Sequence, residues 1–334
     1  MLPTILSAYP HDCQPEASEF LGNAGGFSGA LLWKLKTVRA VLCLRRWPAN
    51  HPSSTTLQWI HRVLAHVASQ GSAPVPVPIK CSHGNTFLLV DGHHWELTPW
   101  MPGEANYHHD PTPQKLKSAM QTLAEFHRAA SDVQISSAVS RSILERLEFT
   151  KKLLDSDLQR WQEKISHSSD NVHYDRCHEV LSRAMPLLPT VLSVLQPAAN
   201  TTFSLQPCLR DIWHDHVLFQ REEVSGLIDF GAMRTECVAG DVARLLGSLV
   251  GDDQDGWEEG LASYEQVRPL SHEERRVLLP LDQANVVLSG MNWIRWLIVE
   301  RRTFEDSHAV DQRLDAILSR LRIASETGGF SAKF

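Results

Sequence analysis

The sequence predicts an α+β fold in which a small N-terminal part carries an antiparallel sheet and one helix, while a large C-terminal part is mostly helical. Two observations carry this prediction. Before residue 99, short runs of β-branched and other apolar residues alternate with glycine- and proline-containing turns. From residue 113 onward, most apolar residues recur at the spacing of one helix face. We therefore predict one domain over residues 1–99 and a second over residues 100–334.

The bulk composition narrows the class of protein. A chain of 334 residues can bury a substantial core, and its net charge of -7 argues against a nucleic-acid partner. No apolar run approaches the length of a membrane span, and the first residues lack the basic and apolar regions of a signal peptide. The six cysteines form no C-x-x-C pair, which is typical of reduced thiols. We expect a cytoplasmic protein without a nucleic-acid or membrane partner. The oligomeric state stays open.

Residues 1–20 are predicted to form a short helix or arm, and a glycine-rich loop follows. This loop, residues 22–30, joins an expected strand to the apolar segment Leu31–Lys36. Closely spaced glycines permit positive φ angles and let backbone N–H groups approach phosphate oxygens. The loop therefore indicates either a phosphate-binding turn or a flexible hairpin.

The segment Ala40–Pro48 is predicted to be a strand, because it is rich in β-branched and apolar residues and ends at a proline. Strand alternation places Cys43 and Arg45 on one face and Arg46 on the other. An arginine is a permanent cation whose planar guanidinium can hold phosphates in a bidentate manner. The alternative is a solvated arginine at the sheet edge, and that description fits Arg46 better than Arg45.

The next elements follow from local patterns. Helical spacing of apolar residues predicts a helix over Thr55–Gln70, with Ser53 or Ser54 as its N-cap. Segments 86–90 and 94–98 alternate well enough to form a hairpin around Asp91 and Gly92. From Pro113 the pattern is helical, and we predict a helix there, a helical insertion over 135–200, and helices over 255–266, 271–300 and 308–324.

The most informative stretch carries two acidic residues around a short hairpin. Apolar runs at 217–219 and 224–228 flank a charged link of hairpin length. Asp211 precedes the first run and Asp229 ends the second, so the hairpin would bring Asp211, His216 and Asp229 to one mouth. Phosphoryl transfer needs such a group. One carboxylate orients the attacking hydroxyl and accepts its proton, while a second carboxylate and a neighbouring ligand hold the metal that bridges the phosphates.

The pattern R-D-x-x-x-x-H-V-L-F followed by G-L-I-D-F-G resembles the aminoglycoside phosphotransferase and choline kinase branch of kinase-like enzymes. The resemblance implies a bilobal protein-kinase-like fold and an ATP-dependent kinase that moves the γ-phosphate to a hydroxyl of a small molecule. It also implies a divalent metal, Mg²⁺ or Mn²⁺. No long activation segment and no A-P-E motif follow Gly231, which favours a small-molecule kinase over a protein kinase.

The resemblance also implies roles for individual residues. Asp211 is the expected catalytic base, and the expected metal ligands are His216 and Asp229. The segment 99–104 is the expected hinge between the lobes, and residues 135–200 are expected to contribute to a cap over the acceptor. The residues expected to bind the nucleotide are Gly25, Gly26, Ser28 and Gly29 in the phosphate loop, Arg45 in place of the usual lysine, and Glu96 and Thr98 where the backbone meets the adenine.

Leu209 replaces a histidine of the family pattern that is usually structural, and two further departures leave alternatives open. The helix Thr55–Gln70 lacks the glutamate that would pair with the phosphate-binding cation, so Gln58 or His61 faces Arg45 or the pair is absent. His216 replaces an asparagine, and imidazole suits Mn²⁺ or Zn²⁺ better than Mg²⁺. His216 is therefore either a metal ligand or a hydrogen-bond partner of Asp211. In the second case Asp229, with or without the neighbouring Asp215, holds the metal.

These departures also leave the activity open. The chain is an active kinase, a nucleotide-binding pseudokinase or regulator without turnover, or a phosphotransferase fold used for another reaction. The sequence does not identify the acceptor.

Overall fold

The computed structural model describes residues 2–23, 29–49 and 51–326. The chain packs into two compact units. The first unit contains Met1–Gln134, Leu209–Arg234 and Ser263–Arg268, and the second contains Ile135–Cys208, Thr235–Ala262 and Pro269–Phe334. The predicted domain boundary at residue 99 falls inside the first unit, and the division of the chain there stays a prediction. None of the helices among the described residues has both the length and the apolar character needed to cross a membrane.

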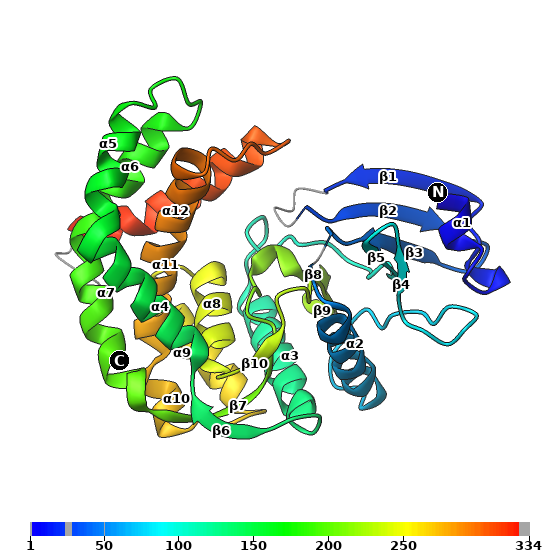
Figure 1. The fold of residues 1–334 in the computed structure, drawn as a ribbon. Helices are drawn as coiled ribbons and strands as arrows, with labels where there is room; N and C mark the ends of the chain where they lie inside the picture. Colours follow the sequence, from blue (N-terminus) through cyan, green and yellow to red (C-terminus); the bar gives the residue numbers. More distant parts are fainter. Residues whose placement is uncertain (1, 24–28, 50, 327–334) are drawn as a thin grey trace. The chain divides into compact units, whose positions relative to one another are not determined.

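The first unit is built on a five-stranded antiparallel sheet with strand order β1-β2-β3-β5-β4 (Figure 1). The strands are β1 (Ala17–Gly22), β2 (Leu31–Lys36), β3 (Val41–Arg46), β4 (Leu88–Val90) and β5 (His93–Pro99). The turn between β4 and β5 places Asp91 at φ 51° and Gly92 at φ 75°, and aspartate and glycine tolerate such angles. The predicted strands and the predicted hairpin are confirmed.

The two faces of this sheet differ as strand alternation predicts. On one face, a core forms between α1 (Leu2–Leu6) and strand residues that include Leu42 and Leu44 of β3. On the other face, His61 of α2 (Ser54–Ser69) bonds Glu96 of β5. Ser53 is the N-cap of α2 and accepts a hydrogen bond from the backbone N–H of Thr56. Arg45 therefore lies on the α2 side of the sheet and Arg46 on the opposite face, and this separation of the two arginines is the one that strand alternation predicts.

After β5 the chain runs against a second hairpin in the first unit, β8 (Val217–Gln220) and β9 (Glu223–Leu227). The backbone groups of Glu104 and Phe219 exchange hydrogen bonds of 3.0 and 2.9 Å. Gly103 makes this approach possible. Its φ is 99°, and a Cβ there would lie 2.7 Å from the Phe219 carbonyl oxygen. Helix α3 (Pro113–Ser131), capped by Thr112, completes this part of the unit.

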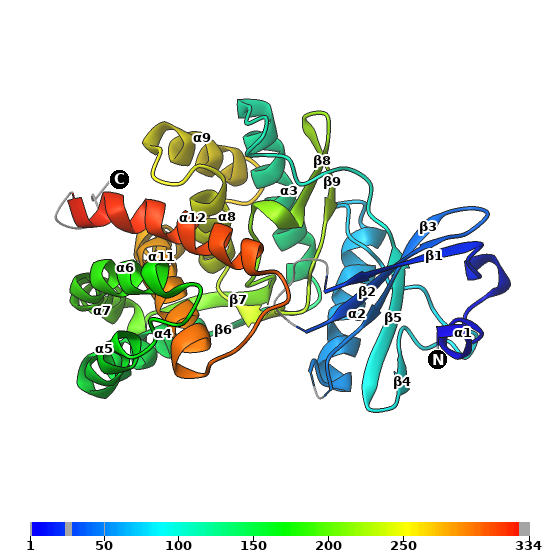
Figure 2. The ribbon, with the colours of Figure 1, turned by 90° about the horizontal axis from the view of Figure 1, so that it is seen from above.

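The second unit is mostly helical. Its centre is α11, which packs against α6, α7, α8 and α12 (Figures 1 and 2). A helix with neighbours on most sides is apolar nearly all round, and α11 buries most of its side chains. The helices of this part of the chain are α4 (Arg141–Lys152), α5 (Leu158–Ser166), α6 (Tyr174–Ala184), α7 (Leu188–Leu195), α8 (Ala239–Leu249), α9 (Gln254–Glu265), α10 (His272–Arg276), α11 (Leu278–Ile294) and α12 (Ser307–Glu326).

Two predictions for this part of the chain were wrong in detail. The expected all-helical insertion begins with strand β6 (Ser136–Val139), which pairs with β7 (Thr202–Cys208). Strand β10 (Arg234–Glu236) lies on the other side of β7. The segment 136–139 is short and mostly exposed, so its sequence shows no alternation that would predict a strand. Its extended conformation is determined by pairing with β7. The expected helix over 271–300 is divided into α10, α11 and a π-helical segment, Arg295–Val299.

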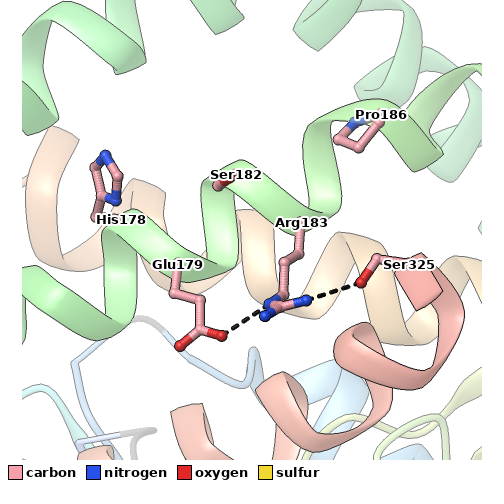
Figure 3. A pocket seen from close by; sticks show the side chains of 6 residues that line it. All are labelled: His178, Glu179, Ser182, Arg183, Pro186 and Ser325. Carbon is pink, nitrogen blue, oxygen red and sulfur yellow. Dashed lines mark hydrogen bonds and ion pairs between the residues drawn. The ribbon is translucent and has the colours of Figure 1, made fainter.

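An ion-pair cluster joins α6 to α12 on the surface of the second unit. Glu179 accepts a 2.7 Å hydrogen bond from Arg183, which also donates to Ser325 (Figure 3). Arg322 donates two further bonds to the Glu179 carboxylate, at 2.8 and 2.7 Å. The hydrogen bonds from Arg322 and Arg183 lower the pKa of Glu179 to about 2.

Candidate active site

The β8–β9 hairpin brings the two predicted acidic segments together. Val217 lies opposite Leu227, and the backbone N–H of Ile228 donates to the carbonyl of His216 at 3.0 Å. His216 and Asp229 are therefore neighbours across the open end of the hairpin, with 3.7 Å between His216 Nε2 and Asp229 Oδ2. All of these residues belong to the first unit.

The backbone at both segments is in a conformation that L-residues rarely adopt. Arg210, directly before Asp211, has a φ of 66°, and Asp229 has a φ of 62°. Such left-handed angles cost on the order of 1 kcal/mol for a residue with a side chain, so the surrounding contacts must hold them. Backbone of this kind is concentrated at functional sites, because it aims a side chain that regular structure would direct elsewhere.

Trp47 explains why the third residue of the D-F-G motif is glycine. A Cβ at Gly231 would lie 2.7 Å from Cη2 of the Trp47 ring, which is nearer than real side chains approach. Trp47 is buried, and the guanidinium carbon of Arg45 lies 4.7 Å from the centre of its ring. The indole therefore packs against Gly231 and also supports Arg45 through a cation–π contact.

Arg45 lies between two carboxylates that come from distant parts of the chain. Its Nη1 is 3.3 Å from Asp229 Oδ1, and its Nε is 3.8 Å from Glu96 Oε1. The Arg45 side chain is 18% exposed and the Asp229 side chain is 39% exposed. Burial raises the pKa of Asp229, but the charges of Arg45 and His216, together with the hydrogen bonds from Arg45 and the Gly231 backbone, outweigh it, and the pKa is held below its ordinary value. Asp229 is thus an ionised carboxylate at the edge of the site.

The other carboxylate, Glu96, is buried and is bonded to helix α2. His61 Nε2 lies 2.7 Å from Glu96 Oε2, and His61 Nδ1 lies 2.7 Å from the hydroxyl of Thr86. Burial raises the pKa of Glu96, but the hydrogen bond from His61 and the charges of His61 and Arg45 together have a larger, opposite effect. The pKa of Glu96 is therefore below its ordinary value. His61 of α2 therefore reaches the strand beside Arg45, and its partner is Glu96 rather than Arg45.

Both ring nitrogens of His216 have partners. His216 Nδ1 lies 2.7 Å from the carbonyl oxygen of Asp211, and the indole N–H of Trp213 donates to His216 Nε2 at 2.9 Å. A carbonyl oxygen only accepts and an indole N–H only donates. The proton of the neutral ring is therefore on Nδ1, and the lone pair of Nε2 points at Trp213. The bond to Asp211 involves its main chain, not its carboxylate.

The remaining predicted residues are placed as follows. Gly25, Gly26 and Ser28 lie outside the described residues, while Gly29 is described and has a φ of 77°. In the β3–β5 register, Thr98 lies opposite Cys43 and Glu96 lies opposite Arg45. The structure thus brings Arg45, Glu96, His216 and Asp229 into one chain of contacts. Roles in adenine binding for Glu96 and Thr98 stay predictions.

Sequence reasoning missed an aromatic group beside the Asp211 loop. The ring of His214 lies 4.5 Å from that of Trp213 and 4.2 Å from that of His108, both nearly edge to face. His108 is more than a hundred positions earlier in the chain, on the connection that begins with the Glu104–Phe219 bridge. No local pattern marks His108, because only the pairing of that connection with β8 brings it to the loop.

Asp229 thus joins a half-buried arginine on the sheet to the hairpin whose other end carries Asp211, an arrangement that is typical of kinase-like phosphotransferases. Solved structures agree on the fold. A microcompartment-associated aminopropanol kinase matches with a TM-score of 0.64 at 14% identity, over 99% of this chain and 98% of that one. An aminoglycoside phosphotransferase from Alicyclobacillus acidocaldarius subsp. acidocaldarius DSM 446 matches with a TM-score of 0.57 at 17% identity, over 97% and 96%. The predicted protein-kinase-like α+β fold is confirmed.

The sequence comparison is more specific. The model of the phosphotransferase enzyme family matches residues 19–279, and the chain belongs to that family. A curated relative, the homoserine kinase of Gluconobacter oxydans (strain 621H), is 38% identical over 82 residues. That match spans 23% of this chain and 26% of the homoserine kinase, so it covers only about a quarter of the relative.

Proposed function

We propose that the protein is an ATP-dependent kinase that transfers the γ-phosphoryl group to a hydroxyl of a small molecule. The observation that carries this proposal is the 3.3 Å ion pair between Arg45 and Asp229, which joins a cation on the sheet to the acidic loop after β9. Membership of the phosphotransferase enzyme family supports it. A cation suited to bind phosphates next to a carboxylate suited to bind a metal is what phosphoryl transfer requires.

Asp211 is proposed as the catalytic base. Its carboxylate would orient the acceptor hydroxyl and accept its proton as the oxygen attacks the γ-phosphorus. The bond from that phosphorus to the bridging oxygen of ADP breaks in the same transfer, and ADP leaves with the electron pair. The left-handed backbone at Arg210 and the hydrogen bond from His216 to the Asp211 carbonyl would hold this carboxylate in position.

Arg45 is proposed to hold the phosphates of the nucleotide. Its guanidinium is partly exposed and paired only at long distance with Glu96, so its Nη atoms can exchange the Asp229 contact for phosphate oxygens. The glycine-rich loop with Gly25, Gly26, Ser28 and Gly29 is proposed to cover the same phosphates through its backbone N–H groups. Glu96 and Thr98 are proposed to mark the strand whose backbone meets the adenine.

The residues present fit a divalent metal in part. Asp229 offers an ionised, 39% exposed carboxylate, the ligand that Mg²⁺ and Mn²⁺ prefer. His216 Nε2 lies 3.7 Å from that carboxylate, but it could bind a metal only after releasing the indole N–H of Trp213. A bound ion would neutralise charge on the phosphates. We therefore propose Asp229 as the primary ligand and His216 as a second ligand in competition with Trp213.

The relatives suggest where to search for the acceptor. The homoserine kinase and the aminopropanol kinase are both named for small alcohols that carry an amino group. The solved aminoglycoside phosphotransferases are named for larger acceptors. We propose a small hydroxyl compound as the acceptor, with amino alcohols first and amino sugars second.

The test separates nucleotide binding from turnover. Thermal unfolding is measured with ATP, GTP and adenosine, with and without Mg²⁺ or Mn²⁺, because a ligand that binds the folded state raises the midpoint. ADP release is then measured across amino alcohols and amino sugars, with phosphorylated product detected by mass spectrometry. Acceptor-dependent ADP release that disappears in Asp211→Asn supports the kinase. Nucleotide binding without product formation across the screen would support a nucleotide-binding regulator instead.

A further inference from the structure

We infer that His61 is a positioning residue for nucleotide binding, and that it acts on Arg45 through Glu96. The inference rests on the proposed function, since it takes Arg45 as the phosphate-binding cation. Helix α2 carries no glutamate, and the side chains that contact Arg45 among the described residues are those of Asp229, Glu96 and Trp47. The structure supplies the carboxylate from strand β5 and lets the helix orient it.

The Glu96 carboxylate divides its two oxygens between its partners. Oε2 accepts the hydrogen bond from His61 Nε2 at 2.7 Å, and Oε1 faces Arg45 Nε at 3.8 Å. A short bond on one oxygen fixes the rotation of the whole carboxylate. Since both Glu96 and His61 are almost completely buried, water does not compete for these atoms. The direction in which Oε1 attracts Arg45 is therefore determined by His61.

His61 itself is held from its other side. Its Nδ1 lies 2.7 Å from the Thr86 hydroxyl, and the Phe87 ring packs nearly edge to face against the imidazole at 6.0 Å. The ring plane is thus determined by contacts on both sides. The position of α2 therefore determines the position of the Glu96 carboxylate through His61. A glutamate on the helix would act on Arg45 by direct contact.

Arg45 needs such a guide because it has two acidic neighbours. Glu96 faces Nε, while Asp229 faces Nη1, and the ring of Trp47 lies under the guanidinium at 4.7 Å. With Glu96 oriented by His61, the Nε edge stays toward the sheet and the Nη atoms stay toward the loop, where the phosphates are proposed to bind. Without His61, Glu96 can turn and draw the guanidinium away from that side.

The same helix and strand offer a matched control. Ser54 of α2 bonds His94 of β5 at 2.7 Å, two residues before Glu96 on the same face of the strand. Ser54→Ala removes a hydrogen bond between α2 and β5 but leaves the contacts among His61, Glu96 and Arg45 in place. This variant therefore measures how the loss of one hydrogen bond between helix and sheet affects stability and nucleotide affinity when the contacts of Arg45 are intact.

The experiment compares ATP with adenosine by calorimetry in the presence of Mg²⁺, together with the unfolding midpoint. His61→Phe and Glu96→Gln should each weaken ATP about tenfold, as expected for loss of one charge-assisted bond. Adenosine affinity should change by less than about twofold, because adenosine carries no phosphate. His61→Gln, whose amide can still donate to Glu96, should retain most of the ATP affinity. Ser54→Ala should lower the unfolding midpoint and leave the ratio of the two affinities unchanged.

Glu96→Gln also separates positioning from simple charge. The substitution removes a negative charge near the phosphates, so repulsion alone predicts tighter ATP binding. Positioning predicts weaker binding, and it predicts that His61→Phe adds little once Glu96 is glutamine. If His61→Phe does not fold, the Glu96→Gln result decides the inference.

Two outcomes would overturn the inference. They differ in whether the proposed role of Arg45 survives. If Arg45→Ala weakens ATP while His61→Phe and Glu96→Gln do not, only the role of His61 is lost. If Arg45→Ala leaves ATP affinity unchanged, the proposed phosphate-binding role of Arg45 fails, and the inference fails with it.

Discussion

The indole N–H of Trp213 donates a 2.9 Å hydrogen bond to Nε2 of His216, on the side of the imidazole that faces Asp229. The other nitrogen, Nδ1, is bonded to the Asp211 carbonyl. His216 therefore ties the Asp211 loop together, and its only lone pair is engaged by Trp213. Whether His216 also ligates a metal depends on how readily that indole is displaced.

Trp213→Phe should expose the Nε2 lone pair of His216 to a metal. Imidazole favours Mn²⁺ over Mg²⁺, so Mn²⁺-dependent ATP binding should strengthen several-fold while Mg²⁺-dependent binding changes little. Adding His216→Asn should remove the gain. Trp59→Phe is the control, because it also deletes an indole hydrogen bond, to Gln134, at an exposed position. An unchanged metal preference in Trp213→Phe would exclude His216 as a ligand.

Asp211→Asn should abolish phosphoryl transfer and leave ATP affinity within a few-fold of the parent. The proposed role of Asp211 is to accept the proton of the acceptor hydroxyl, and an amide cannot do this. Product formation and calorimetry measure the two properties separately. Asp91→Asn is a neutral control, since asparagine also tolerates the positive φ of that turn. Equal turnover in Asp211→Asn and the parent would remove Asp211 from the mechanism.

Asp229→Asn should lose metal-dependent ATP binding as well as rate, unlike Asp211→Asn. The substitution removes the ionised carboxylate proposed to hold the metal, and it also removes the 3.3 Å partner of Arg45. Calorimetry of ATP at several Mg²⁺ and Mn²⁺ concentrations measures the metal dependence directly. If ATP affinity keeps its dependence on metal, another ligand holds the ion.

Arg45→Ala should weaken ATP far more than adenosine, since only ATP presents phosphate charge. Arg46→Ala is the matched control on the same strand. Its side chain points to the opposite face, where the guanidinium lies 5.9 Å from the Trp95 ring. Affinities for both ligands are measured by calorimetry. A larger loss of ATP affinity in Arg46→Ala than in Arg45→Ala would place the phosphate contact on the Arg46 face of β3 and contradict the proposed role of Arg45.

Glu179 should contribute to the stability of the second unit in a pH-dependent way. Hydrogen bonds from Arg322 and Arg183 lower the pKa of Glu179 to about 2. A group whose pKa is lower in the folded state stabilises that state above the unfolded pKa of about 4.3 and loses this contribution as pH falls toward the folded value. Glu179→Gln should therefore lower the unfolding midpoint at pH 7 and have a smaller effect near pH 3. An equal effect at both pH values would contradict the prediction.

Much of this protein could be predicted from local sequence patterns. The alternation of β3 determines that Arg45 and Arg46 face opposite ways, and the Asp91–Gly92 turn determines the β4–β5 hairpin. The apolar runs around residues 220–223 determine the β8–β9 hairpin, and with it the proximity of His216 and Asp229. Each of these features depends on neighbours within a few residues, whose periodicity the sequence records directly.

Only the tertiary structure determined which side chains these residues contact. Glu96 lies beside Arg45, where the sequence left Gln58, His61 or no partner open, and His61 bonds Glu96 rather than Arg45. Trp47 requires glycine at position 231, although nearly two hundred residues separate them. Such contacts depend on which strands and loops pack together. Sequence periodicity identifies the face on which a side chain lies, but side-chain packing between distant segments determines what it meets there.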